Sequence, residues 1–340
     1  MAMNNRAAWL LKKQDAALVV DDAPYNKPSA NEIVIMTKAV AINPADFAIQ
    51  KMGIIIDAYP AILGCDVAGV VKEIGASIAD FKVGDRVMGQ AAPLPGGIYK
   101  HSGFQQYVVL RMPCIAKIPD DASWTDATVL PLGINTAASC LFQEGLLALG
   151  MPPSKGAKGE TLLIWGASSS VGSCGVQLAA AAGYEVFGIA SKKNHDFVKS
   201  VGAAQTFDQS DPNIVREIVA ALKGKTCVGA YDAISEETTL HTLCDILHES
   251  GGKKLIASIM PGVEKLTKHQ VTIKTNFAKT NAETPVGQQI WRVYLEPALA
   301  SGAIQYKPEA EIVGHGLESV QHAMDLLAQA VSAKKLVVSI

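Results

Sequence analysis

Small residues follow a short apolar run in the stretch 162–173, Leu-Leu-Ile-Trp-Gly-Ala-Ser-Ser-Ser-Val-Gly-Ser. This order predicts a buried strand, a tight turn and the start of a helix. At such a turn backbone N–H groups can approach a diphosphate, and the helix dipole favours its negative charge. Small side chains are required because larger ones would hold the phosphate away from the backbone. We therefore expect a dinucleotide to be bound here, with its diphosphate against Ser168, Ser169, Ser170, Val171 and Gly172.

A second apolar run, residues 184–190, follows the expected helix, so the turn lies in a strand–helix–strand frame. Ser191 comes 19 residues after Gly172, close to the usual offset, about 20 residues, of the residue that reads the adenosine ribose. An NAD site usually has Asp or Glu there, whereas this chain has Ser191-Lys192-Lys193-Asn194. A hydroxyl and an ammonium would hold a 2′-phosphate that a carboxylate would repel. We therefore predict NADPH, bound by Ser191, Lys192 and Asn194; the alternative is that the lysines are only solvated surface charges.

Composition limits the class of protein. The chain has 340 residues, of which 49% are hydrophobic and 18% charged, which suggests two globular domains. A net charge of −2 gives no reason to expect nucleic acid or an anionic membrane as a partner. No apolar run reaches the roughly 18 residues of a membrane span, and the first residues lack the apolar core of a signal peptide. We expect a cytoplasmic protein, and the six cysteines, which form no C-x-x-C pair, should be reduced.

Two kinds of pattern divide the chain. Residues 6–125 show short strands at spacings near ten residues with Gly and Pro between them, which suggests a barrel-like β unit. A helix is expected at 126–149, and strands then alternate with helices up to the strand 253–259, which predicts a doubly wound parallel sheet. Ile259 and Met260 end that strand and should face the cofactor crevice. Helices are expected at 286–300 and 317–330.

Three further motifs resemble the medium-chain dehydrogenase/reductase superfamily: Asn43-Pro44-Ala45-Asp46, Gly64-Cys65-Asp66-Val67-Ala68-Gly69 and Val83-Gly84-Asp85-Arg86-Val87. With the serine-rich turn and the closing Lys335-Leu336-Val337, the chain is similar to fungal trans-acting enoyl reductases and quinone oxidoreductase-like proteins. The resemblance implies an α/β protein with two domains. A GroES-like β-barrel catalytic domain would span residues 1–125 and 285–340, and a Rossmann NADPH-binding domain would span 126–284. It also implies cofactor contacts from Asn43, Pro44, Asp46, Leu336 and Val337.

No metal is expected. The resemblance places a zinc-dependent relative's cysteine within 43–46 and its His-Glu pair at Cys65-Asp66. A catalytic zinc site needs three protein ligands, and one thiol beside one carboxylate does not supply them. Without a metal, reduction of an activated carbon–carbon double bond asks less of a protein than oxidation of a simple alcohol.

The predicted function is therefore an NADPH-dependent reductase of an α,β-unsaturated carbonyl or thioester, such as an enoyl chain of secondary metabolism. The alternatives are a quinone or small-enone oxidoreductase and, in another class, a non-catalytic NADPH-binding protein. The substrate would be a small molecule or a carrier-bound chain, with a polyketide synthase as a partner, and the protein would be a monomer or homodimer. Leu132, Gly133, Asn135 and Thr136 either line the substrate site or pack a helix. No catalytic residue is assigned; Tyr59, Tyr99, His101 and solvent are candidate proton donors.

Overall fold

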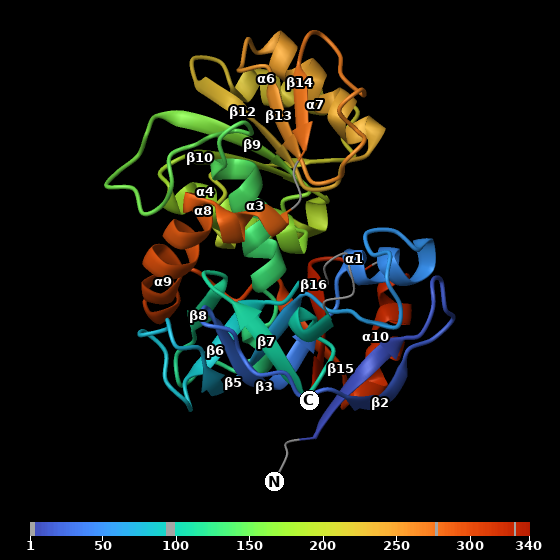
Figure 1. The fold of residues 1–340 in the computed structure, drawn as a ribbon. Helices are drawn as coiled ribbons and strands as arrows, with labels where there is room; N and C mark the ends of the chain where they lie inside the picture. The colour runs from blue at the N-terminus through green and yellow to red at the C-terminus, as the bar shows by residue number, and fades with distance from the viewer. Residues whose placement is uncertain (1–3, 93–98, 276–277, 330) are drawn as a thin grey trace. The chain divides into compact units, whose positions relative to one another are not determined.

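The computed structural model describes residues 4–92, 99–275, 278–329 and 331–340 (Figure 1). The chain divides into two compact units. The first unit comprises Met1–Leu132, Leu295–Ser301 and Glu309–Ile340. The second comprises Gly133–Tyr294 and Gly302–Pro308. The first unit is therefore built from segments at both ends of the sequence.

The first unit is dominated by antiparallel strands. One sheet has the order β15-β16-β3-β5-β6-β8, with β7 also paired to β3, and a smaller sheet has the order β2-β1-β4. Their bounds are β1 (Asn5–Leu10), β2 (Val19–Ala23), β3 (Glu32–Ala41), β4 (Ala61–Ile62), β5 (Asp66–Ile74), β6 (Arg86–Gln90), β7 (Tyr107–Arg111), β8 (Ile115–Lys117), β15 (Glu309–His315) and β16 (Lys334–Ser339).

The C-terminal strand β16 completes the larger sheet of this unit. It pairs antiparallel with β3, with Val337 opposite Ala41, and parallel with β15. Helix α10 (Val320–Leu327) lies between β15 and β16 in the sequence, and its Val320 and Met324 join the same apolar core as Val338. The remaining helices of this unit are short: α1 (Pro44–Phe47), α2 (Trp124–Ala127) and α9 (Glu296–Ala300).

The second unit is a parallel six-stranded sheet of order β11-β10-β9-β12-β13-β14. Its first strand in sequence, β9, lies in the middle. The next two strands, β10 and β11, lie on one side of β9, and β12, β13 and β14 lie on the other. The predicted α/β class with a doubly wound sheet is thereby confirmed. The strands are β9 (Glu160–Trp165), β10 (Glu185–Ala190), β11 (Gln205–Asp208), β12 (Thr226–Asp232), β13 (Leu255–Ser258) and β14 (Thr272–Thr275).

Helices precede, separate and follow these strands in the sequence. They are α3 (Pro131–Phe142), α4 (Ser170–Ala181), α5 (His195–Ser200), α6 (Ile214–Ala221), α7 (Glu237–Glu249) and α8 (Pro285–Gly287). Ile218 of α6 and Leu243 of α7 are fully buried beside Phe187 of β10 in one apolar core. The apolar stripes of α6 and α7 therefore pack on this sheet.

The prediction of a single helix at 126–149 is wrong. Helix α2 ends at Ala127 and α3 begins at Pro131 and ends at Phe142. The cause is Pro131, whose ring disfavours the helical conformation at Leu130 and which has no N–H to continue a helix from α2. The helix expected at 286–300 is likewise interrupted, since a π-helical segment, Gln288–Leu295, separates α8 from α9.

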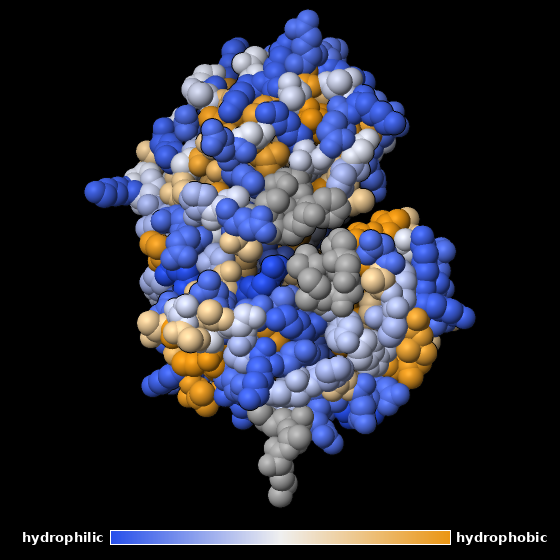
Figure 2. Space-filling model, in the orientation of Figure 1, coloured by the Kyte–Doolittle hydropathy of each residue, from blue (hydrophilic) through white to orange (hydrophobic). Residues whose placement is uncertain are grey.

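The surface is mostly polar. Figure 2 shows hydrophilic side chains over much of the visible face, with apolar residues in separate patches. Large exposed apolar side chains such as Val83, Val293 and Ile312 are far apart in the sequence, as is normal for globular proteins. Among the residues described, no helix combines the length and the apolar character that crossing a membrane requires.

Candidate functional site

The turn between β9 and α4 closes tightly on itself. Gly166 has φ +71°, and the Ser169 N–H donates to the Gly166 carbonyl oxygen at 2.9 Å. Ser169 caps α4, because its Oγ accepts the Gly172 N–H at 3.0 Å. A Cβ added at Gly172 would lie 2.1 Å from the Gly166 oxygen. The turn therefore requires glycine at 172, and its small residues leave the N-terminus of a three-turn helix open to an anion.

The residues expected at the ribose lie beside this turn. Asn194, in the 3₁₀ turn Lys192–Asn194 after β10, donates through Nδ2 to Ser168 Oγ at 3.1 Å. Ser191 is half-buried, and Lys192 is exposed, as is Lys193. Because β9 and β10 are parallel neighbours, their carboxyl ends meet at one sheet edge. The structure thus brings together the predicted diphosphate and ribose residues.

Ile259 and Met260 follow β13 at the same edge of the sheet. The Ile259 N–H donates to Ser235 Oγ at 3.2 Å, and Met260 is exposed. Strand β12 lies between β13 and β9, so these two residues are on the opposite side of the turn from Ser191. Their expected contact with the cofactor stays a prediction.

Helix α3 carries the residues expected at the substrate. A Cβ at Gly133 would lie 2.8 Å from Cys174 Sγ, so α3 packs closely on α4. Asn135 is fully buried, and its Oδ1 accepts from Trp291 Nε1 at 3.2 Å and from Asn281 Nδ2 at 3.0 Å. Thr136 is half-buried. Gly133 and Asn135 therefore have packing roles, and their contact with a substrate stays a prediction.

A buried charged cluster lies in the first unit. Asp66 has no exposed surface. Its Oδ2 lies 2.9 Å from Nζ of Lys335 and accepts a hydrogen bond from Nδ2 of Asn43 at 2.8 Å. Its Oδ1 accepts the Leu132 N–H at 2.5 Å. Lys335 also donates to Asn43 Oδ1 and is only 4% exposed. The charge of Asp66 is thus balanced inside the protein.

Asp46 and Cys65 lie next to this cluster. Asp46 accepts the Asn43 N–H and the Gly64 N–H, each at 2.9 Å. Burial raises the pKa of Asp46 to about 7 and raises the pKa of the Cys65 thiol well above its ordinary value. Cys65 is therefore a protonated thiol at neutral pH.

The other cofactor residues expected here differ in exposure. Pro44 is exposed, whereas Leu336 and Val337 are buried in β16. The Leu336 carbonyl accepts the Ile42 N–H at 3.0 Å, which joins β16 to the end of β3. The cofactor contacts of these residues stay predictions.

The candidate proton donors differ in their contacts and in their burial. His101 Nε2 lies 2.7 Å from Glu32 Oε1, and burial lowers the pKa of His101, so the ring is a neutral partner of that carboxylate at neutral pH. The Tyr99 ring stands edge-on to Trp9, with centroids 4.9 Å apart. Burial raises the pKa of Tyr59. None of these contacts singles out a catalytic acid.

Some residues of these sites were missed from sequence. Lys335 belongs to the closing motif, and a lysine inside an apolar strand pattern is a signal of a buried partner. Asp232, Ser235 and Ser258, which lie at or just after the ends of β12 and β13, gave no such signal because short polar residues are common where strands end.

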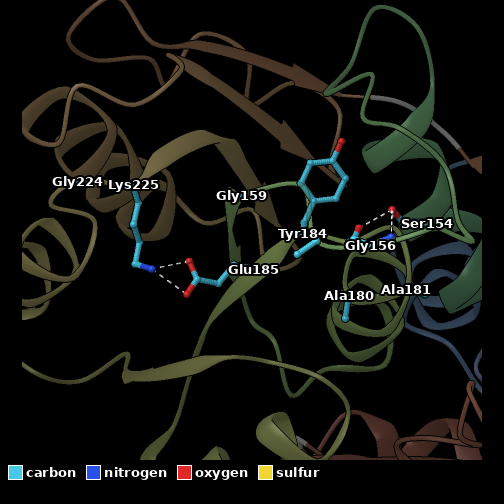
Figure 3. Close-up of a pocket in the computed structure, with 11 residues that line it drawn as sticks. Ser154, Gly156, Gly159, Ala180, Ala181, Tyr184, Glu185, Gly224 and Lys225 are labelled. Atoms are coloured by element: carbon cyan, nitrogen blue, oxygen red, sulfur yellow. Dashed lines mark hydrogen bonds and ion pairs between the residues drawn. The ribbon is translucent and has the colours of Figure 1, made fainter.

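A pocket of about 720 Å³ lies elsewhere in the second unit (Figure 3). It is lined by Gly159, Tyr184 and Glu185, and by Lys225, which is paired with Glu185 at 2.8 Å. These residues lie at or next to the amino ends of β9, β10 and β12. Dinucleotides bind at the carboxyl ends of such sheets, so this pocket is not the dinucleotide site.

Two protein-family models match the chain: alcohol dehydrogenase GroES-like domain over residues 29–120 and zinc-binding dehydrogenase over residues 170–285. The chain is 40% identical to the zinc-binding alcohol dehydrogenase domain-containing protein cipB of Emericella nidulans, covering 99% of each chain. It is 37% identical to the trans-enoyl reductase himH of Aspergillus japonicus, covering 99% of this chain and 97% of the relative.

The fold also matches solved structures. A quinone oxidoreductase of Pseudomonas syringae pv. Tomato DC3000 superposes with a TM-score of 0.75 at 23% identity, covering 99% of this chain and 100% of that one. With the GroES-like family match, this likeness confirms the expected fold, a GroES-like domain joined to a Rossmann-type parallel sheet.

Replacing Gly172 by valine should abolish tight dinucleotide binding, because any Cβ there collides with the Gly166 carbonyl. Calorimetric titration should show at least about a 10-fold weaker Kd, equivalent to about 1.4 kcal/mol. Gly156→Ala is the matched control, since a Cβ at that position meets no heavy atom within 4 Å. Unchanged affinity in a folded Gly172→Val variant would contradict the assignment of this turn.

Replacing Lys335 by methionine should destabilise the protein, because it leaves the Asp66 carboxylate buried without a cation. The expected loss is about 3–5 kcal/mol in the free energy of unfolding, measured by urea denaturation. Lys334→Met is the control, because Lys334 is exposed and pairs with Glu311 at the surface, where an ion pair contributes about 0–1 kcal/mol. Equal losses of unfolding free energy from the two substitutions would show that the buried pair contributes no more to stability than the surface pair.

Proposed function

Because the chain belongs to the medium-chain dehydrogenase/reductase superfamily, we propose that it reduces the activated double bond of an α,β-unsaturated carbonyl compound or thioester with NADPH. The superfamily consists of oxidoreductases that use nicotinamide cofactors. In this proposal the second unit binds NADPH and the first unit is catalytic. The domain bounds expected from sequence, 126–284 and 1–125 with 285–340, differ from the two compact units, because residues 285–294 and 302–308 belong to the second unit. The relative himH, 37% identical, is a trans-enoyl reductase, which supports this reaction class.

The main support is the state of Asp66. Both of its oxygens already accept hydrogen bonds, and its charge is neutralised by Lys335. Cys65 beside it is held as a neutral thiol by burial, which raises its pKa. Within the described part of the chain, no group of three or more His, Cys, Asp or Glu side chains could hold a metal. We infer that the reaction proceeds without a zinc Lewis acid, although one matching family is named for zinc binding.

The cofactor choice is supported by charge. The four residues directly after β10, 191–194, include no carboxylate, whereas an NAD site would present one there to the ribose hydroxyls. Lys192 and Ser191 supply an ammonium and a hydroxyl instead, and Asn194 holds Ser168 in the neighbouring turn. NADPH, when bound, supplies the hydride.

The chain's own residues would orient the reactants and stabilise charge. The turn of Ser168–Gly172 would hold the diphosphate, and Ile259 would contact the nicotinamide half. Hydride addition to the β-carbon leaves an enolate oxygen, which needs hydrogen-bond donors. Thr136, whose side chain is half-buried on α3, is the donor we propose, while Asn135 positions α3 through its bond to Trp291. Orientation alone can lower such a barrier by roughly 7–11 kcal/mol.

The proposed substrate class is an enoyl chain, free or carried by a polyketide synthase. A quinone or small enone is the second candidate, and a non-catalytic NADPH-binding role is the rival from another class. The three differ in what they do to NADPH in the presence of an acceptor.

The decisive assay follows NADPH absorbance with a panel of enoyl thioesters, small enones and quinones. We expect turnover with enoyl thioesters at a kcat/KM higher than that for quinones, with the saturated thioester as product by mass spectrometry. Faster turnover of quinones would favour the second candidate, and no consumption with any acceptor would contradict the proposal as a whole.

The same assay after treatment with a strong chelator tests metal independence. Activity should persist, and elemental analysis should find far less than one zinc per chain. Stoichiometric zinc whose removal abolishes activity, and whose return restores it, would contradict this and point to alcohol–aldehyde interconversion.

Lys192→Ala should raise the KM for NADPH by about 10- to 100-fold, because a charge-assisted hydrogen bond to phosphate is worth roughly 1.5–3 kcal/mol. The KM for NADH should change little, because NADH has no 2′-phosphate. Lys193→Ala, which removes the charge of the neighbouring lysine, also exposed, should have a much smaller effect. A wild-type preference for NADH would show that the end of β10 has been misinterpreted.

A further inference from the structure

Two buried hydroxyls meet at the carboxyl ends of β12 and β13. Ser235 lies just after β12, and its Oγ is 2.6 Å from Oγ of Ser258, the last residue of β13. Ser258 has no exposed surface and Ser235 is 9% exposed. We propose that this pair is a donor site for the carboxamide oxygen of the nicotinamide. This inference rests on the proposed function, because it needs a dinucleotide at this sheet edge.

The two serine hydroxyls carry one hydrogen more than their mutual hydrogen bond uses. Ser235 Oγ accepts the Ile259 N–H at 3.2 Å and shares one hydrogen with Ser258. Each hydroxyl carries a single hydrogen, so one of the two is not used between them. Within the described residues no protein acceptor takes it. Since Ser235 is the more exposed of the two, we expect Ser258 to donate its hydrogen to Ser235 and Ser235 to donate its own hydrogen to an acceptor on the ligand. Ser235 would then accept two hydrogen bonds and donate one.

The backbone holds Ser235 in an unusual conformation for this purpose. Its φ is +71°, in the left-handed region that side chains with a Cβ disfavour. Fully buried Asp232 enforces this conformation, because its Oδ1 accepts the N–H of Ile234 at 2.9 Å and of Ser235 at 3.1 Å. Thr239 fixes the other carboxylate oxygen, donating to Oδ2 at 2.6 Å. Strain maintained by a buried network is typical of ligand-binding positions.

The position of Ser235 matches the nicotinamide half of a dinucleotide. The residue before it, Ile234, packs on the phosphate turn, because a Cβ at Gly166 would lie 2.6 Å from Ile234 Cγ1. Ser191 and Asn194 lie on the β10 side of β9, whereas Ser235 and Ser258 lie on its β12 side. A dinucleotide whose diphosphate lies at β9 and whose adenosine lies over β10 therefore extends its nicotinamide over β12 and β13.

The test compares whole cofactor with a fragment. Calorimetry on the full chain would measure Kd for NADPH and for 2′-phospho-ADP-ribose, which lacks the nicotinamide. Ser235→Ala should weaken NADPH binding by about 3- to 10-fold, the usual range for one lost hydrogen bond, and should leave the fragment unchanged. Equal weakening of both ligands, or no weakening of NADPH, would overturn the proposal.

Ser235→Gly separates the hydroxyl from the backbone. Glycine adopts a positive φ without strain, so this variant should be at least as stable as Ser235→Ala but lose NADPH affinity to the same extent. If the residue served only to shape the turn, Ser235→Gly would bind NADPH as the wild type does. Ser250→Ala is the control, because Ser250 Oγ bonds the Ile246 carbonyl at 2.7 Å at the end of α7, and its NADPH affinity should not change.

The result also separates this inference from the proposed function. If the wild type binds NADH in place of NADPH, the same comparison is made with NADH and ADP-ribose. A wild type that binds neither dinucleotide overturns both claims. Tight binding that the Ser235 variants leave untouched overturns the hydroxyl site alone.

Discussion

A carboxylate without exposed surface keeps its charge only if neighbouring groups replace water, and much of the first unit follows from how Asp66 meets that need. Its partners are Lys335 on β16, Asn43 at the end of β3 and the Leu132 N–H at the start of α3. One side chain thus requires the C-terminal strand to return to the N-terminal sheet. It also fixes the backbone at Leu132, the residue at which the first segment of that unit ends. The required cation is a lysine of the chain itself.

The second unit depends on a different constraint, the close approach of two backbone segments. Gly172 meets the Gly166 carbonyl so closely that no side chain fits, and Asn194, in the turn after β10, donates a hydrogen bond to Ser168. The predicted contributions of the two units differ: the second would present backbone donors and lysines to an anionic cofactor, and the first holds the buried Asp66 carboxylate paired with Lys335. In the proposed reaction the protein orients an acceptor that is already activated, which is why we propose a conjugated double bond and not an alcohol as the substrate.

The fold was largely predictable because it rests on local signals: a small-residue turn between an apolar strand and a helix, and the alternation of strands and helices after it. Contacts between residues far apart in the sequence were not predictable in this way. Nothing near Lys335 indicates that its partner is Asp66, and nothing near Ser235 indicates Ser258. The split between α2 and α3 had a local cause, Pro131, which was outweighed by the apolar periodicity around it. Helix length was therefore overestimated where a proline signal was available.

The central claim is that hydride goes from NADPH to the β-carbon of an activated double bond. NADPH carrying deuterium at its transferable C4 position tests it most directly, with an enoyl thioester as acceptor and mass spectrometry and NMR of the product. The account predicts a saturated thioester with one deuterium, located at the β-carbon. Deuterium on the former carbonyl carbon, in an alcohol or aldehyde product, would contradict it, as would a product that contains no deuterium.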